Sequence, residues 1–173
     1  MNSRYTLVIV ALALIGTVQS VAAEETTQED CKFTRTSFEM TIPCEWKTPQ
    51  EADGGDPIVI DLGDDAGHLR IYFSEETASL RKIARKMRKT ARVERWKLRS
   101  RRRVRIDGNR ALATLFDIRK GALKTRQLFY FFNVDDGRYI LHFGAHSKRF
   151  DYRRFRRVAA SFKRRIQSAQ VVK

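Results

Sequence analysis

Cysteine and histidine are scarce in this chain, which has two cysteines and three histidines among its 173 residues. Metal sites built from these side chains need further ligands at close spacing, and the cysteines have none nearby. His142 and His146 have the spacing of a helical metal site, but they lie on or just past an expected strand, where that separation is about 13 Å. His68 stands alone in an expected turn. We therefore predict no metal site and no cofactor.

The short motifs that carry chemistry are missing as well. The sequence has no glycine-rich phosphate loop, no paired-carboxylate signature and no nucleophile elbow. Catalytic residues can also be assembled from distant positions, which no local motif reveals. On these grounds we expect a protein that is not an enzyme.

Near the N-terminus, no hydrophobic run reaches the length of about 20 residues that crosses a bilayer. The apolar run Leu7–Ile15 follows Arg4 and precedes the small residues Val21–Ala23. This arrangement is typical of a cleaved secretory signal peptide over residues 1–23, with an uncleaved membrane anchor as the alternative. We therefore expect a periplasmic or secreted protein.

The two cysteines favour a disulfide, because an exported chain enters an oxidising compartment. Cys31 and Cys44 are 13 positions apart. If Lys32–Arg35 and Phe38–Pro43 form a hairpin that turns near Ser37, the cysteines face each other across its open end. We predict a Cys31–Cys44 disulfide, with two free thiols or half of a metal site as the alternatives.

Negative charge is scarce in the C-terminal part of the chain. Residues 66–173 hold 31 basic and 8 acidic residues, whereas residues 24–65 hold 3 basic and 12 acidic ones. Between Arg81 and Arg105 there are 14 Lys or Arg and one acidic residue, Glu94. Such a surface favours anionic partners, although the net charge of +15 can also serve only to keep an exported protein soluble.

The basic stretch begins with a predicted amphipathic helix. Leu80, Ile83, Met87 and Ala91 recur at helical spacing and form one apolar stripe. Ser74 is the expected N-cap. Because the stripe is small, we expect the helix to pack on a sheet rather than to lie on a membrane. Cations occupy the rest of its circumference: Arg81, Lys82, Arg85, Arg88, Lys89 and Arg92.

After Glu94 the pattern changes to the period of two that is typical of a strand. An unbroken strand would place alternate residues on one face, at intervals of about 6.6–6.8 Å. Ser100 and Arg102 interrupt the apolar side, so we expect a bulge or bend there. Like charges in a row repel one another, so burial of the basic face without a partner is not expected. Its six cations are Arg95, Lys97, Arg99, Arg101, Arg103 and Arg105.

The other segments predict further strands and a second helix. A helix begins near Asp151, with Phe155, Val158 and Phe162 in helical register. We expect one domain over residues 31–166, after a mobile acidic tail at 24–30 and before a frayed C-terminus at 167–173. Apolar runs predict strands at Ile58–Leu62, Leu69–Phe73, Ala111–Ile118, Leu128–Phe132 and Tyr139–Phe143.

The order of these elements resembles the PsbP-like superfamily, including bacterial periplasmic proteins of the DcrB type. The resemblance implies an α+β fold, with an antiparallel sheet of about 6–8 strands and two main helices packed on it. It also implies a binding or assembly role without catalysis. It rests on Phe38-x-Met-x-Ile-Pro43-x-x-Trp46, the helix after Tyr72-Phe73, Val104-x-Ile-Asp-Gly108, Gly137-x-Tyr139-x-Leu141 and the closing helix that ends Ser161-Phe162.

Three functions fit these features. Our first hypothesis is a binding module whose basic face docks on an acidic protein, anionic lipid headgroups or lipopolysaccharide. The second is sequence-independent nucleic-acid binding by the same cations, with Trp96, Tyr152 and Phe155 among them. The third is self-assembly, in which acidic residues 24–65 of one copy meet the basic half of another. Export favours the first over the second, because nucleic acid is seldom a ligand outside the cytoplasm.

Overall fold

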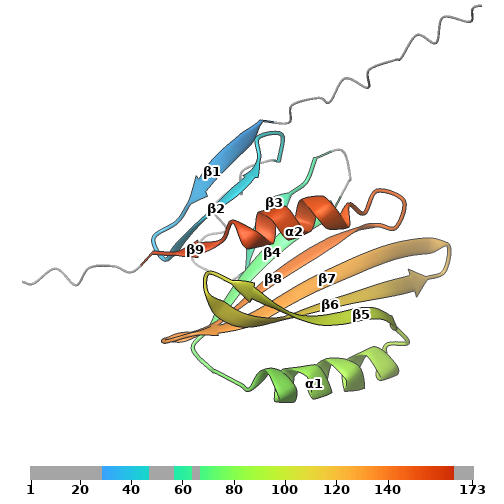
Figure 1. The fold of residues 1–173 in the computed structure, drawn as a ribbon. Helices are drawn as coiled ribbons and strands as arrows, with labels where there is room; N and C mark the ends of the chain where they lie inside the picture. Colours follow the sequence, from blue (N-terminus) through green and yellow to red (C-terminus); the bar gives the residue numbers. More distant parts are fainter. Residues whose placement is uncertain (1–28, 47–56, 64–66, 166–173) are drawn as a thin grey trace, which may run out of the picture.

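The structure is a computed structural model that describes residues 29–46, 57–63 and 67–165. The predicted signal peptide, residues 24–28 of the predicted tail, the loop at 51–56 and the segment 167–173 lie outside these ranges. Within the ranges the chain forms nine strands and two helices (Figure 1). They are β1 (Asp30–Thr34), β2 (Phe38–Pro43), β3 (Ile58–Asp61), β4 (Gly67–Ser74), α1 (Leu80–Val93), β5 (Lys97–Ile106), β6 (Asn109–Lys120), β7 (Leu123–Val134), β8 (Gly137–His146), α2 (Tyr152–Ala160) and β9 (Lys163–Arg164).

Six of the strands form one antiparallel sheet in the order β3-β4-β8-β7-β6-β5. Tight turns join the last four strands in sequence. Asp107 and Gly108, between β5 and β6, have φ values of 48° and 76°, which a two-residue hairpin of this kind requires. The continuous apolar run of β7 lies between β6 and β8, as its pattern predicted. Strand β5 therefore forms one edge of the sheet, and β3 forms the other.

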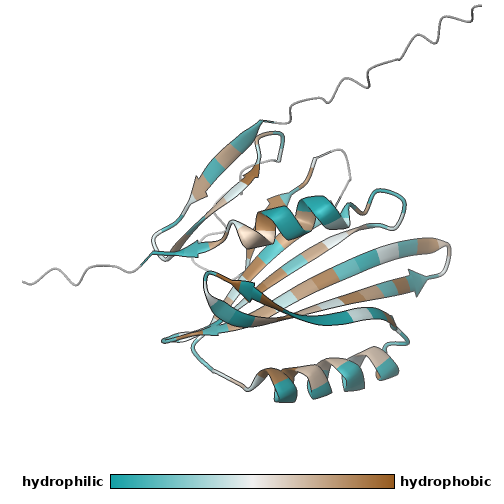
Figure 2. Cartoon of the chain, in the orientation of Figure 1, coloured by the Kyte–Doolittle hydropathy of each residue, from teal (hydrophilic) through white to brown (hydrophobic). Residues whose placement is uncertain are grey.

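The two helices cover opposite faces of this sheet (Figure 1). On one face, the ring of Phe155 in α2 stacks on Phe143 of β8, with 5.0 Å between the ring centroids. On the other, Ile83 of α1 packs in one cluster with Leu112 of β6 and Phe131 of β7. Both helices are apolar on one side and polar on the other (Figure 2). The α+β fold with two helices on an antiparallel sheet is thus confirmed.

Strands β1, β2 and β9 form a separate small sheet, which the sequence did not predict. The β1–β2 hairpin is the predicted one, and the Cys31–Cys44 disulfide closes its open end, with 4.9 Å between the two Cα atoms. Phe38 of β2 stacks on Phe162 at 5.2 Å between centroids, which joins this sheet to the core.

Helix α1 begins five residues later than the predicted N-cap implied. Its cap is Ser79, whose hydroxyl oxygen accepts a hydrogen bond from the Lys82 amide at 3.2 Å. Ser74 is still part of β4, where it pairs with Arg138 of β8. The helix cannot start until the chain has left the sheet, so the prediction of Ser74 as the cap was wrong. Over the described residues, no helix has the length and apolar content to cross a membrane.

Candidate anion-binding surface

Helix α1 carries three arginines along the side that faces β5. Because α1 turns its apolar residues onto the sheet, the positions next to that stripe lie at its rim. Arg81, Arg85 and Arg88 occupy one such row, at i, i+4 and i+7, and all three are exposed. The packing that holds the helix on the sheet therefore also holds these cations toward the sheet edge.

A bulge in β5 decides where its cations point. Leu98 pairs with Phe116, and Ser100 pairs with the next residue of β6, Leu115, so Arg99 is an extra residue without a pair. Residues that pair across an antiparallel ladder share a face of the sheet. The bulge therefore reverses the alternation of side chains before and after Arg99.

The predicted bulge is confirmed, but the bulge splits the predicted row of six cations. Arg101, Arg103 and Arg105 pair with Thr114, Leu112 and Arg110 and so lie on the α1 face. Lys97 pairs with Asp117 on the opposite face. Arg95 precedes the strand, in a turn where its φ is 54°. A single face with six cations is therefore wrong, because one extra residue and one turn redirect three of them.

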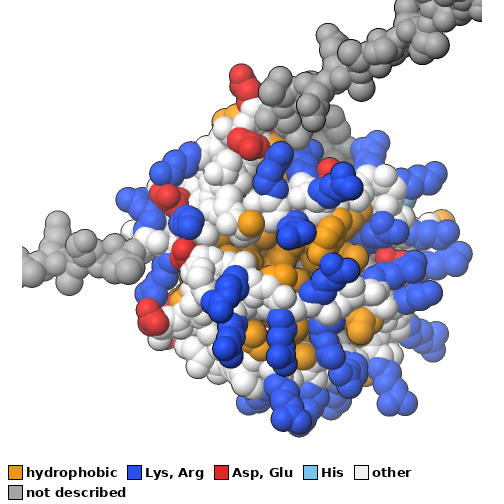
Figure 3. Space-filling model, in the orientation of Figure 1, with side chains coloured by type: hydrophobic (Ala, Val, Ile, Leu, Met, Phe, Trp, Pro, Cys, Tyr) orange, Lys and Arg blue, Asp and Glu red, His pale blue; other side chains and the backbone are white. Residues whose placement is uncertain are grey.

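The arginines of α1 and β5 line one groove at the edge of the sheet, which we call the arginine groove. Its volume is about 540 Å³. Apolar side chains from α1 and β6 also line it: Leu80, Ala84 and Leu112. Figure 3 shows Lys and Arg side chains gathered over α1 and β5, in the lower half of the view. The six groove arginines are Arg81, Arg85, Arg88, Arg101, Arg102 and Arg103.

Within the described ranges, none of the six groove arginines forms an ion pair with a carboxylate. Arginines elsewhere do: Arg154 pairs with Glu45, and Arg164 pairs with Asp135 and Asp136 at 3.1 and 3.0 Å. At the spacing of alternate strand residues, about 6.7 Å, two cations repel by about 0.6 kcal/mol in water and by more near a protein surface. A bound anion would relieve this repulsion.

Of the other predicted site residues, one is neutralised and the rest surround the groove. Arg99 donates to Asp117 at 2.6 Å, and Arg126 donates to the same carboxylate at 3.3 Å. Burial acts to raise the pKa of Asp117, but these two arginines outweigh it and lower the pKa. Exposed cations on α1 and β5 that do not line the groove are Lys82, Lys89, Arg92 and Arg105.

Two residues of this surface were not predicted. Arg102 lines the groove, although it alternates with the predicted cations. Arg110 of β6 lies opposite Arg105 and lines a neighbouring hollow of about 780 Å³ with Arg103 and Arg105. The Asp107-Gly108 turn signal was sufficient to place Arg110 across the hairpin from Arg105.

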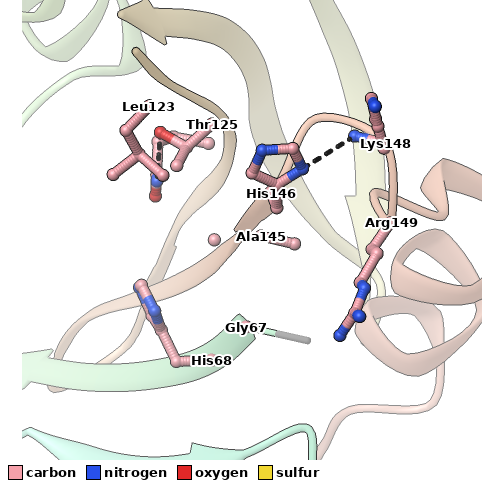
Figure 4. Close-up of a pocket in the computed structure, with 10 residues that line it drawn as sticks. Gly67, His68, Leu123, Thr125, Ala145, His146, Lys148 and Arg149 are labelled. Carbon is pink, nitrogen blue, oxygen red and sulfur yellow. Dashed lines mark hydrogen bonds between the residues drawn. The ribbon is translucent and has the colours of Figure 1, made fainter. Parts of the chain in front are cut away.

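A second hollow, of about 620 Å³, lies where β4, β7 and β8 end. Its lining includes His68 and His146, which Figure 4 shows apart, on either side of Ala145. The prediction that His68 stands alone in a turn was wrong: β4 begins at Gly67, and His68 lies 5.1 Å from His142 between ring centroids. No group of three metal-ligating side chains occurs in the part of the chain that the structure describes.

The two adjacent histidines are held neutral. Burial, with the neighbouring charges of His68 and Arg70, lowers the pKa of His142 to about 3. Burial and Arg70 also lower the pKa of His68. The Nε2 atom of His142 contacts the side-chain oxygen of Gln127, which fixes a proton on that nitrogen because an amide oxygen only accepts. Neutral imidazoles do not attract anions, so this pocket is not part of the basic surface.

An antiparallel sheet between two helices, with a basic groove at one edge, defines this α+β protein. No protein-family model matches the sequence, and no curated protein matches it. Among solved structures, cyanobacterial PsbP (CyanoP) from Synechocystis sp. PCC 6803 is similar over 87% of this chain and all of its own, with 17% identity and a TM-score of 0.62. The chain has a PsbP-like fold, as the sequence resemblance implied.

A crystal structure from Bacteroides thetaiotaomicron VPI-5482 is similar over 75% of this chain, with 14% identity and a TM-score of 0.55. This chain spans only 46% of that protein. Identities this low show a shared fold and carry no information on the ligand of the arginine groove.

Proposed function

We propose that this protein is an exported, non-catalytic binding module whose arginine groove docks on an anionic component of the cell envelope or on an acidic protein. One observation carries the proposal: six arginines from two elements line one groove, and none has a carboxylate partner among the described residues. Export is supported by the signal-like N-terminal sequence and by the Cys31–Cys44 disulfide, which fits an oxidising compartment.

The residue type favours carboxylate or phosphate ligands. A guanidinium group is planar, keeps its charge and donates two parallel hydrogen bonds to either anion. The apolar floor formed by Leu80, Ala84 and Leu112 lowers the local dielectric constant, which strengthens each of these contacts. Because most of the groove is open to solvent, its affinity should fall as salt concentration rises.

A pair of charge-reversal variants tests the proposal. Arg85→Glu with Arg103→Glu changes both walls of the groove, whereas Arg153→Glu with Arg156→Glu makes the same change in net charge on exposed positions of α2. The measurement is the affinity for poly-L-glutamate and for vesicles that contain anionic lipid, at low and high salt. We expect the groove variant to lose about tenfold to a hundredfold in affinity and the α2 variant to lose much less.

Equal losses in the two variants would show that net charge, and not the groove, binds these anions. Circular dichroism of both variants serves as the folding control, since all four positions are on the surface. If the unmodified protein shows no salt-sensitive binding to either probe, the proposed function is wrong.

The aromatic residues behind the nucleic-acid hypothesis are occupied within the fold. Trp96 is half-buried and lies 5.7 Å from Phe116 and 6.5 Å from Phe129 between ring centroids. Phe155 is 2% exposed. Stacking on bases requires open ring faces, so these residues do not favour nucleic acid over other anions. A single-stranded oligonucleotide is therefore best used as a third probe, and Trp96→Ala would weaken its binding selectively if base stacking contributed.

A further inference from the structure

Strand β5 leaves one of its edges without a strand partner. It is the last strand of the six-stranded sheet, and within the described residues it pairs only with β6 (Figure 1). An edge strand presents a row of backbone N–H and C=O groups to which another extended chain can bind. The bulge at Arg99 ends the regular part of this edge, which therefore runs from Ser100 to Ile106.

The hairpin determines which residues of β5 present these groups. Ile106 and Asn109 flank the two-residue turn and form a hydrogen-bonded pair, and such pairs alternate with non-bonded pairs along an antiparallel ladder. Val104, Arg102 and Ser100 therefore direct their N–H and C=O groups to β6. The intervening residues direct theirs to the open edge, and these are Arg101, Arg103 and Arg105.

The open backbone groups and the groove-facing cations thus belong to the same residues. Arg101, Arg103 and Arg105 carry their side chains on the α1 face and their free N–H and C=O groups on the outer edge. Across the groove, the cations of α1 face the same space. A chain added beside β5 would have alternate side chains on the α1 face at the same interval of about 6.7 Å.

We propose that the groove's ligand is an extended acidic peptide, which adds as an antiparallel strand to the free edge of β5 with acidic side chains at alternate positions. This inference rests on the proposed function and specifies its partner. Directly opposite Arg101, Arg103 and Arg105, each acidic side chain enters the groove, while its own backbone bonds to the strand. A row of like charges protects an edge against neutral or basic strands, so the arginines also select for acidic ones.

The test uses peptides rather than protein variants, so that folding is not in question. A short capped peptide of alternating glutamate and threonine is compared with two backbone-methylated forms, one methylated on every glutamate nitrogen and the other on every threonine nitrogen. All three carry the same charge. In the antiparallel arrangement the glutamate N–H groups bond to β5 and the threonine N–H groups face solvent. We expect glutamate methylation to weaken binding more than about tenfold and threonine methylation to have little effect.

Amide hydrogen exchange of the protein gives a second measurement. Binding of the unmethylated peptide should slow exchange at Arg101, Arg103 and Arg105, whose N–H groups point to the open edge. Exchange at Arg102 and Val104, which already bond to β6, should change little.

The outcomes separate the inference from the function on which it rests. If the two methylated peptides bind equally well, the groove recognises charge alone, as it would on a lipid or nucleic-acid surface, and strand addition is overturned while anion binding stands. If neither the unmethylated peptide nor poly-L-glutamate binds, the proposed function fails as well. A selective loss on threonine methylation would also overturn the antiparallel arrangement, because a parallel strand bonds through those residues.

Discussion

At the scale of single residues, the outer face of the sheet contains polar side chains whose protonation is set by burial. His142 stacks on Phe129, with 4.2 Å between ring centroids, and its Nε2 atom bonds to Gln127. Neighbouring His68 and Arg70 add positive charge, which disfavours a proton on His142. Its lowered pKa means that the folded state binds this proton less readily than the unfolded chain does.

Acid should therefore destabilise the protein through His142. Below the ordinary histidine pKa of 6.5 the unfolded chain takes up the proton, and the folded state resists until about pH 3. Stability from this residue is complete above pH 6.5 and falls with decreasing pH by up to about 1.4 kcal/mol per pH unit. We expect His142→Gln to show a weaker loss of unfolding free energy than the unmodified protein, measured by urea unfolding at several pH values from neutral to mildly acidic.

The variant itself will lose some stability at every pH, because Gln127 loses part of its hydrogen bonding and Phe129 loses a stacked ring. Only the slope against pH tests the argument. Parallel stability curves for the two proteins would contradict it and assign the acid sensitivity to other groups.

Single residues are also where prediction from sequence was weakest. The alternation after Glu94 predicted one row of cations, and an irregularity near Ser100 was expected, but its position decides which arginines share a face. One extra residue at Arg99 moves Lys97 to the opposite side of the sheet. Local sequence cannot fix this register, because it depends on which β6 residue pairs with each β5 residue.

At the scale of elements, the position of α1 controls the groove. The helix is held by a small cluster, in which Ile83 is 6% exposed and contacts the group around Leu112 and Phe131. Its cations are therefore placed by a few apolar contacts. The apolar stripe predicted this docking from sequence, since periodicity is a local signal. The start of the helix was mispredicted because Ser74 belongs to a strand through pairing with distant β8.

Truncation of Ile83 should loosen the helix and disrupt the groove together. We expect Ile83→Ala to lower the free energy of unfolding by about 2–4 kcal/mol, since it removes buried methyl groups and leaves a cavity. Val93→Ala, in the same helix at 71% exposure, is the matched control and should change stability by less than about 0.5 kcal/mol. Denaturant unfolding measures both.

Anion binding by the same two variants extends the test. Ile83→Ala should weaken binding of poly-L-glutamate although no charge has changed, because α1 no longer holds Arg81, Arg85 and Arg88 against β5. Undiminished affinity in a folded Ile83→Ala protein would indicate that the helix cations act independently of the groove.

At the scale of the whole molecule, the helices divide the sheet into two sides with different tasks. The α2 side, together with the small sheet, contains the aromatic core, including Phe38, Phe132 and Phe162. The α1 side carries the arginine groove. Element order was enough to predict the fold class, because apolar patterning and turns largely determine architecture. The ligand was not accessible in the same way, because a shared fold does not specify a site.

The division predicts that the disulfide stabilises the core without affecting the groove. Cys31 and Cys44 are separated by 13 positions, and a crosslink over such a loop contributes about 3 kcal/mol. It holds the β1–β2 hairpin, whose Phe38 packs on Phe162. We expect a reducing agent to lower the free energy of unfolding by about 2–4 kcal/mol. Under conditions where the protein stays folded, reduction should leave the affinity for poly-L-glutamate unchanged, because α1 and β5 lie away from the small sheet.

The variant in which both cysteines are replaced by alanine is the control, since its stability should match that of the reduced protein and should not respond to the reducing agent. Loss of anion binding on reduction, with the fold intact by circular dichroism, would contradict the division into two sides. It would mean that the small sheet and the α1–β5 edge are coupled through β6, β7 and β8, the strands that separate α1 from α2.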